Sequence, residues 1–301
     1  MDIKKAGMCI LMLLVTVGPA NADNQRALLN GSRLAFSRLL TNDYIGDRKD
    51  RWRTFSYAVS VLKPFEDKSV GELRFRTEII AGRKLKLASG QDPDRRMAGV
   101  LGIGAYRSAV IGKSDYRIGV ELTAIGPQTG LVNLQERVHE KLNQSGPSAY
   151  AKELQVGDRI LLGFNGETGR DFIVGQTAVR PWVAVEGGAE AFARVGMDFT
   201  LGHTVGNYGI RDELTGWRLP ILQNRNTHGI SLIAGFDIAH VVNSVYIEEG
   251  DLTQNRLRLR AGGLVDFKSG RIFYGATYLS EEFKNQPENQ VVGSVTISMF
   301  F

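Results

Sequence analysis

The sequence predicts an all-β fold, a transmembrane antiparallel β-barrel of about twelve strands with one short helix in an extracellular loop. Three observations support this: a short apolar segment near the N-terminus, long strands with alternating apolar and polar residues, and a last strand ending in phenylalanine. Together they indicate an exported protein that crosses a membrane with strands.

Residues 1–22 have the pattern of a secretory signal peptide. Two lysines precede an apolar run from Met8 to Val17, and Ala20-Asn21-Ala22 provides small residues for cleavage. The run is too short to span a bilayer as a helix. We expect cleavage near Ala22, which leaves residues 23–301 as one outer-membrane β-barrel domain.

The composition excludes several kinds of site. The only cysteine, Cys9, lies in the predicted signal peptide, so the exported chain has neither disulfides nor thiolate metal ligands. A net charge of +5 is mild. Nucleic acid is not an expected partner of an exported protein, whereas the charge is compatible with binding to an anionic surface. No linker or repeat divides the chain.

The strands are long and have one apolar face. In residues 191–202 apolar side chains alternate with polar ones or glycine. A soluble β-sandwich also alternates, but its strands are shorter, about five or six residues. The opposite faces carry charges such as Arg74, Arg194 and Asp198, as expected for a polar lumen. The predicted strands are 32–41, 54–63, 71–82, 98–112, 114–127, 158–166, 172–186, 189–203, 228–242, 254–267, 271–282 and 291–301.

The last strand, VVGSVTISMFF, ends in Phe301. This ending resembles the closing strand of Gram-negative outer-membrane barrels, so we expect outer-membrane localisation and recognition of Phe301 by the barrel-assembly machinery. An even strand count places both termini in the periplasm. The connection 204–227 should then be a short periplasmic turn, yet it is long and contains Pro220, which the pattern does not explain.

Three polar clusters fall in connections that should face outward. The first contains Asn42-Asp43 and the run GDRKDR, and the second contains DPDRR at 92–96. The third contains the predicted helix 131–142, on which Gln135 and His139 lie one turn apart beside an apolar stripe. The stripe comprises Leu131, Leu134, Val138 and Leu142.

Each cluster has an ordinary interpretation and a functional one. Asn-Asp after a strand is common turn chemistry, and a histidine beside an apolar stripe is usually a half-buried surface residue. Held over the lumen, however, His139 could take a proton from water, with Gln135 fixing its tautomer. Arg95 and its basic neighbours could bind lipopolysaccharide phosphates.

Serine and zinc hydrolase signatures are missing. There is no Gly-x-Ser-x-Gly, no serine at an evident pairing distance from a histidine, and the four histidines are isolated in the sequence. A water nucleophile with a hard cation remains, and calcium suits the oxygen donors near Asn42-Asp43.

These residues resemble motifs of the outer-membrane lipid A 3′-O-deacylases, twelve-stranded barrels that remove an acyloxyacyl chain from lipid A. Asn42-Asp43 matches that family's Asn-Asp. Ile125 to Pro127 followed by Gln135-x-x-x-His139 matches its Gly-Pro … Gln-x-x-x-His segment. Asp94-Arg95 followed by Ala98-Gly99 is similar to its Asp-Arg … Ala-Gly element.

The resemblance implies roles for these residues. His139 would be the general base that activates water, and Gln135 would orient it. Asn42 and Asp43 would help to bind calcium and position the substrate. The cation would polarise the ester carbonyl.

The chain departs from the family at the start of the second strand. The family has Tyr-Thr-x-Gly, with the threonine in the active site, whereas this chain has Trp52-Arg53-Thr54-Phe55. Alternation directs Thr54 inward, so Thr54 is expected to replace the missing threonine.

Two other functions remain open from the sequence. An outer-membrane phospholipase would need a serine beside a histidine in the folded barrel. A non-enzymatic porin-like or structural barrel, including an inactive family member, would need no convergence of His139 with Asn42-Asp43, whereas the deacylase chemistry does.

Overall fold

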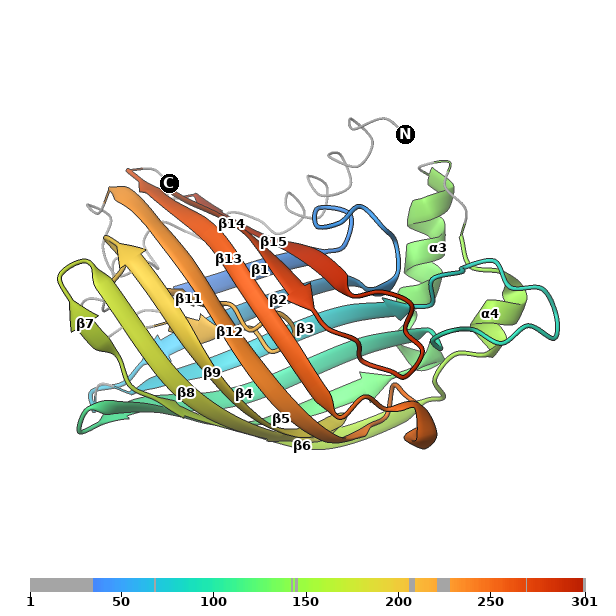
Figure 1. The fold of residues 1–301 in the computed structure, drawn as a ribbon, viewed down its shortest axis with the longest axis horizontal. Helices are drawn as coiled ribbons and strands as arrows, with labels where there is room; N and C mark the ends of the chain where they lie inside the picture. Colours follow the sequence, from blue (N-terminus) through green and yellow to red (C-terminus); the bar gives the residue numbers. More distant parts are fainter. Residues whose placement is uncertain are drawn as a thin grey trace.

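A closed barrel of twelve antiparallel strands forms the body of the computed structural model (Figure 1). The structure describes residues 35–299 except 68, 142, 144–145, 206–208, 221–227 and 269. The predicted signal peptide and Phe301 lie outside the described residues and stay predictions. The barrel strands are β1 Ala35–Asn42, β2 Trp52–Pro64, β3 Val70–Ala81, β4 Ala98–Ile111, β5 Ser114–Ile125, β6 Arg159–Gly169, β8 Thr177–Gly187, β9 Glu190–Gly202, β12 Gly229–Ser244, β13 Asn255–Phe267, β14 Gly270–Leu279 and β15 Gln290–Met299.

The first and last strands close the sheet. β1 pairs with β15 through Leu40↔Val295, Thr41↔Ser294 and Asn42↔Gly293. Closure removes the unpaired strand edges that a bilayer does not tolerate. Among the described residues no helix is both long enough and apolar enough to cross a membrane.

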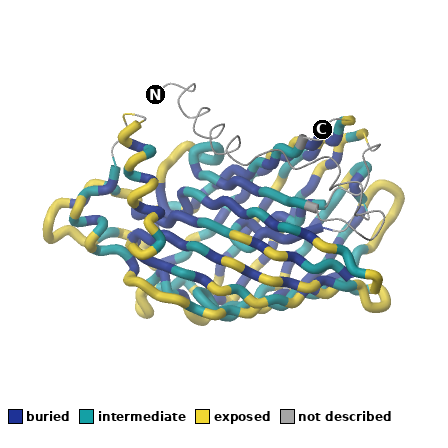
Figure 2. Tube along the Cα trace, turned by 180° about the vertical axis from the view of Figure 1, so that it is seen from behind, coloured by how far each residue is buried: buried dark blue, intermediate teal, exposed yellow. Residues whose placement is uncertain are grey.

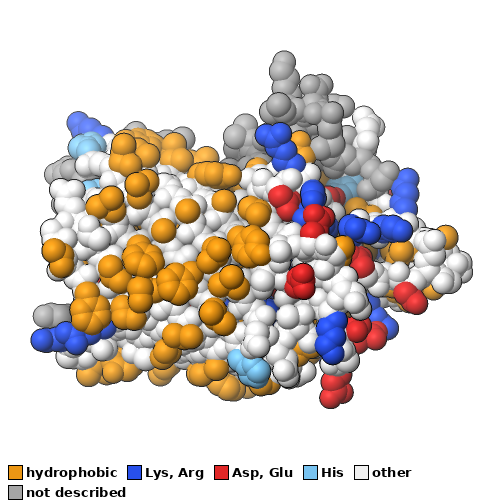
Figure 3. Space-filling model, in the orientation of Figure 1, with side chains coloured by type: hydrophobic (Ala, Val, Ile, Leu, Met, Phe, Trp, Pro, Cys, Tyr) orange, Lys and Arg blue, Asp and Glu red, His pale blue; other side chains and the backbone are white. Residues whose placement is uncertain are grey.

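The outer surface is divided along the barrel axis. Apolar side chains cover much of the wall in Figure 3, and charged side chains gather toward the end that carries the helices. The tube view shows exposed and buried residues alternating along the strands (Figure 2). This is the two-faced pattern that the sequence predicts.

One predicted strand was wrong. Residues 172–186 contain a hairpin, because β7 (Phe172–Val174) continues the line of β6 and pairs with β8 through Phe172↔Val179. The turn is at Gly175, whose φ of 59° suits glycine. The turn that we expected at 167–171 is instead the end of β6 and the short connection that leads to β7.

The predicted helix 131–142 is present as α3 (Leu131–Lys141), but it is accompanied by a second one. α4 (Ala149–Glu153) begins after Ser148, whose hydroxyl accepts a hydrogen bond from the Ala151 N–H. Five residues are too few to show helical periodicity, so the sequence did not reveal α4. Short 3₁₀ turns are η1 (Pro127–Thr129) and η2 (Glu249–Asp251).

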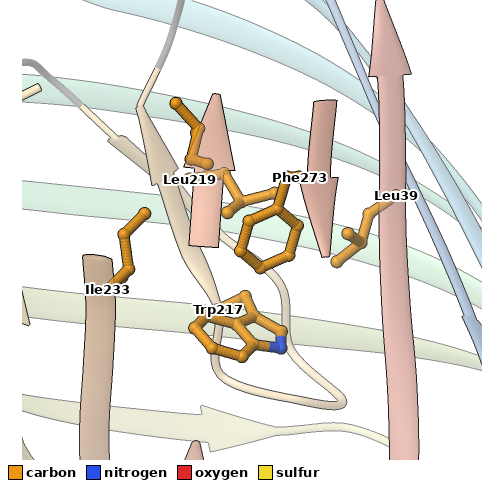
Figure 4. Packing of buried hydrophobic residues seen from close by; sticks show 6 residues of the cluster. Leu39, Trp217, Leu219, Ile233 and Phe273 are labelled. Carbon is orange, nitrogen blue, oxygen red and sulfur yellow. The ribbon is translucent and has the colours of Figure 1, made fainter. Parts of the chain in front are cut away.

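The unexplained connection 204–227 contains a hairpin that plugs the lumen. β10 (Gly209–Arg211) pairs with β11 (Arg218–Pro220). Trp217 is fully buried, with its ring centroid 4.9 Å from that of Phe273. Figure 4 shows it surrounded by apolar side chains from the hairpin and the wall. The cluster comprises Leu39, Trp217, Leu219, Ile233, Leu264 and Phe273.

The hairpin also completes the ion pairs of the lumen. Arg211 donates to Asp198 at 2.7 Å and to Glu167 at 2.6 Å. Glu213 pairs with Arg74 and Arg117 of the wall. Buried charges are stable only when paired, so the charged inner face requires these partners.

We expect Trp217→Ala to lower the free energy of unfolding by about 3–5 kcal/mol, because it leaves a cavity in the only large apolar contact of the hairpin among the described residues. Urea unfolding in detergent measures this. Val174→Ala, at a site 82% exposed, is the control and should change stability by less than about 0.5 kcal/mol. Equal stability of the Trp217 variant and the unchanged protein would contradict the plug assignment.

Candidate active site

Helix α3 packs on the outer face of the barrel wall. A Cβ at Gly99 would lie 3.0 Å from the Leu131 Cβ, and Gly99 shares its face of β4 with Ile103, which is 51% exposed. Ala98 and Val100, on the other face, belong to a cluster inside the barrel with Tyr246. The expectation that His139 is held over the lumen was therefore wrong, because the close approach at Gly99 seats the helix outside.

The helix buries its polar flank. The buried residues are Leu131, Val132, Gln135 and His139, whereas Leu134 of the predicted apolar stripe is 54% exposed. Val132 packs with Ala81 and other apolar residues of the neighbouring loop. The stripe prediction was thus partly wrong, and Gln135 and His139 are buried instead of flanking it.

His139 meets the first outer loop at Asp50. The His139 Nε2 lies 3.6 Å from the Asp50 Oδ2, an electrostatic contact longer than a hydrogen bond. Partial desolvation raises the pKa of Asp50, whose side chain is 37% exposed, while the charge of His139 lowers it. Asp50 therefore links α3 to the first outer loop. It was not singled out from the sequence, although it lies in the run GDRKDR.

Asn42 and Asp43 fix the shape of this loop. The Asn42 Nδ2 donates to the Thr54 carbonyl at 2.8 Å, and its Oδ1 accepts the Tyr44 N–H at 2.8 Å. The Asp43 Oδ2 accepts the Arg51 N–H at 2.8 Å. The side chain of Asn42 thus stabilises the turn after β1, as asparagine commonly does after a strand.

Asp43 is a buried acid beside a second acid. Burial, and then the charge of Asp50, hold the pKa of Asp43 well above its usual range, against the N–H groups of Arg51 and Tyr44. Two neighbouring carboxyl groups with raised pKa values fit a hard cation, because its positive charge would offset both the burial of Asp43 and the repulsion between the two carboxylates. No group of three or more His, Cys, Asp or Glu side chains forms a metal cluster within the part of the chain that the structure describes. Asp43 and Asp50 would therefore need backbone or amide oxygens as further ligands.

Among the described residues, Gln135 has no hydrogen-bond partner at either amide atom, although it is buried. It therefore does not orient His139 by a hydrogen bond in this structure. Unpaired buried polar groups are costly, so the amide is an available contact for a bound molecule.

A β-bulge explains the altered motif of β2. The pairing with β3 shifts between Arg53↔Ile80 and Phe55↔Ile79, which makes Thr54 the extra residue. Arg53 reaches into the lumen, where it pairs with Glu78 at 2.6 Å. Thr54, and not Arg53, is therefore the residue that joins the candidate site.

Arg95 forms an ion pair in the outer loops. It is buried, and its Nη1 pairs with Glu282 of another outer loop. Burial lowers the pKa of the Arg95 guanidinium. The structure thus places Arg95 in a loop-to-loop ion pair, and its contact with lipid A stays a prediction.

Asp43 gives a pH prediction. Because its folded pKa is raised, the contribution of Asp43 to stability falls as pH rises from the ordinary carboxyl value of about 4 toward the folded pKa. Asp43→Asn removes this penalty while an amide oxygen can still accept the Arg51 N–H. Without calcium, the unfolding free energy of the variant relative to the unchanged protein should increase from pH 4 to pH 7, measured by urea unfolding. If the difference in unfolding free energy between the variant and the unchanged protein did not change with pH, the pKa of Asp43 would not be raised in the folded state.

Comparison with known proteins agrees with the motifs. The model of the family described as outer membrane protein LpxR matches residues 8–301. The solved structure of LpxR from Salmonella typhimurium is similar, with a TM-score of 0.74 and 18% identity over 88% of this chain and 99% of that chain. The β domain of the Bordetella autotransporter BrkA covers 88% of this chain and 98% of its own, at a TM-score of 0.44 and 10% identity. No curated protein sequence matches. The resemblance is thus confirmed: this chain belongs to the LpxR family of outer-membrane proteins.

Proposed function

We propose that this protein is an outer-membrane esterase that removes the 3′-O-linked acyloxyacyl chain from lipid A of lipopolysaccharide. The observation that carries the proposal is the place of His139, which is buried on the outward-packed helix α3 and in contact with Asp50 of the first outer loop. A site on the outer face is open to a lipid that lies beside the barrel, whereas a site in the lumen is not. Family membership supports the same substrate class.

The residues can divide the work of ester hydrolysis. His139 takes a proton from water, whose oxygen adds to the ester carbonyl carbon. Asp50 stabilises the imidazolium that forms, as a carboxylate does beside other catalytic histidines. The bond to the sugar 3′ oxygen then breaks, and that oxygen receives the proton from His139. Gln135, with its free amide, is a donor for the ester or the water, and Thr54 and Asn42 hold the loop that carries Asp50.

Calcium is the proposed cofactor, held by Asp43 and Asp50. When bound, it would polarise the ester carbonyl as a Lewis acid. We expect chelation to abolish activity and calcium to restore it better than magnesium, which keeps its water shell more tightly. Asp43→Asn should raise the calcium concentration needed for half-maximal activity. Full activity after exhaustive chelation would remove the cation from the proposal.

Mass spectrometry of lipid A from cells expressing the protein tests the activity. The unchanged protein should give lipid A lighter by one acyloxyacyl chain, and His139→Ala should lower the rate by about 10²–10⁴-fold, the usual contribution of a general base. Asp50→Asn should lower it by a smaller factor.

The matched control is Glu140→Ala, at the exposed neighbouring position of the same helix, which should leave the rate unchanged. Unmodified lipid A from all variants, each shown to be folded and supplied with calcium, would indicate an inactive family member.

The structure gives no support to the porin-like alternative. The hairpin 209–220 and its ion pairs occupy the lumen, where a pore would need an open path.

The phospholipase alternative needs a serine beside a histidine, and the described residues contain such an array. The Ser231 Oγ lies 3.0 Å from the His203 Nδ1, and the His203 Nε2 lies 2.6 Å from the Asp266 Oδ2. However, Ser231 is buried at the periplasmic end, its hydroxyl accepts the Thr204 N–H, and Arg271 holds Asp266. A nucleophile needs access to substrate, so this array fits a structural role.

A further inference from the structure

The barrel wall is lower at β8 and β9 than at their neighbours. β6 pairs with β5 from Arg159↔Ile125 onward, but its pairing with β8 begins only at Phe164↔Gly187. On the other side, β12 rises to Ser244, opposite Glu190 at the start of β9. Residues 159–163 therefore have a strand partner on one side only. The resulting gap in the outer rim is about 16 Å high along β6.

A groove of about 1180 Å³ lies at this gap. β6 contributes Arg159, and the segment from Val242 to Asn255 forms the facing side, with Arg96 and Lys284 from neighbouring loops. None of the residues of the candidate active site lines it. The groove is thus a second concave surface at the outer end of the barrel, separate from α3.

The groove exposes polar groups that are not used elsewhere. The side chains of Arg159, Asn243, Gln254 and Lys284 are exposed and make no hydrogen bond or ion pair with any described residue. Arg96 is different, because it pairs with Glu248 at 2.6 Å. Guanidinium and ammonium groups bind phosphate, whereas amides and the remaining carboxylate, Glu249, bind hydroxyls. The free groups therefore match a phosphorylated sugar.

The flanks of the groove are apolar and face lipid. Ile160, next to Arg159 on β6, is 67% exposed, and Val242 on β12 is 61% exposed. The strand edge at 159–163 also leaves backbone groups that need hydrogen-bond partners. A molecule with a polar head and acyl chains would satisfy both surfaces at once.

We propose that this groove, defined by Arg159, Val242, Asn243, Gln254 and Lys284, is a second binding site that holds the phosphorylated sugar head of an outer-leaflet glycolipid. Its acyl chains lie against Ile160 and Val242. Binding at this site does not require hydrolysis at His139, so it can be tested independently of the proposed enzymatic function.

Photo-crosslinking in cells tests the proposal. Benzoylphenylalanine replaces Val242 in the full-length protein, and adducts are detected by gel shift with an antibody against lipopolysaccharide. We expect a glycolipid adduct whose yield falls by roughly an order of magnitude in Arg159→Glu/Lys284→Glu, because two charge-assisted contacts become repulsive. If the double charge reversal prevents folding, Arg159→Gln/Lys284→Gln serves in its place.

The control places the same probe at Ile118, a lipid-facing position on β5 away from the groove. Its adducts report bulk lipid and should not respond to the charge reversal. An adduct at Val242 with the same yield in both backgrounds would show contact with bulk lipid only and overturn the proposal. Adducts with phospholipid alone would overturn it as well.

Discussion

A strand that crosses a bilayer presents alternate side chains to lipid and to the lumen, and this division governs the rest of the structure. On β3, Ile80 belongs to the inner cluster, and its neighbour Ala81 packs under α3 on the outer side. One residue along the chain thus separates the interior from the lipid-facing surface. The candidate site depends on the outer side of this division, since the close approach at Gly99 allows the helix to rest there.

The inner face imposes a different requirement. Its charges cannot reach bulk solvent freely, so many of its carboxylates pair with guanidinium groups, in some cases with several. Asp237 pairs with Arg194, Arg258 and Arg260. The hairpin 209–220 brings both signs of charge and Trp217 into the same space. A filled lumen leaves the outer wall and the rim as the surfaces where a lipid could bind.

The sequence could predict the features that depend on periodicity. Strand alternation, the even strand count and the long helix follow from repeating patterns, and most strand bounds agree within a few residues. The motifs also indicated which loops contribute residues to the candidate site. His139 and the first outer loop do meet, but through Asp50, one of several charged residues in a run where nothing in the sequence distinguishes it.

The features that could not be predicted arise from three-dimensional packing. The hairpin 209–220 has strands of three residues each, too short for a pattern to show. The bulge at Thr54 changes the face of a residue without changing the composition. The side of the wall on which α3 rests depends on a close contact at one glycine, and helical periodicity carries no information about it. For the same reason the sequence suggested Leu134 as buried and missed the burial of the polar flank.

The candidate site exists only if α3 lies against the outside of the wall, and paired cysteines measure this position most directly. In a background with Cys9→Ser, oxidation of Ala81→Cys/Val132→Cys should give a disulfide, because both residues lie in one cluster on the outer face. Ile80→Cys/Val132→Cys, displaced by one residue to the inner face, should give none. The reverse result, bonding through position 80 and not through 81, would place the helix in the lumen and contradict the account.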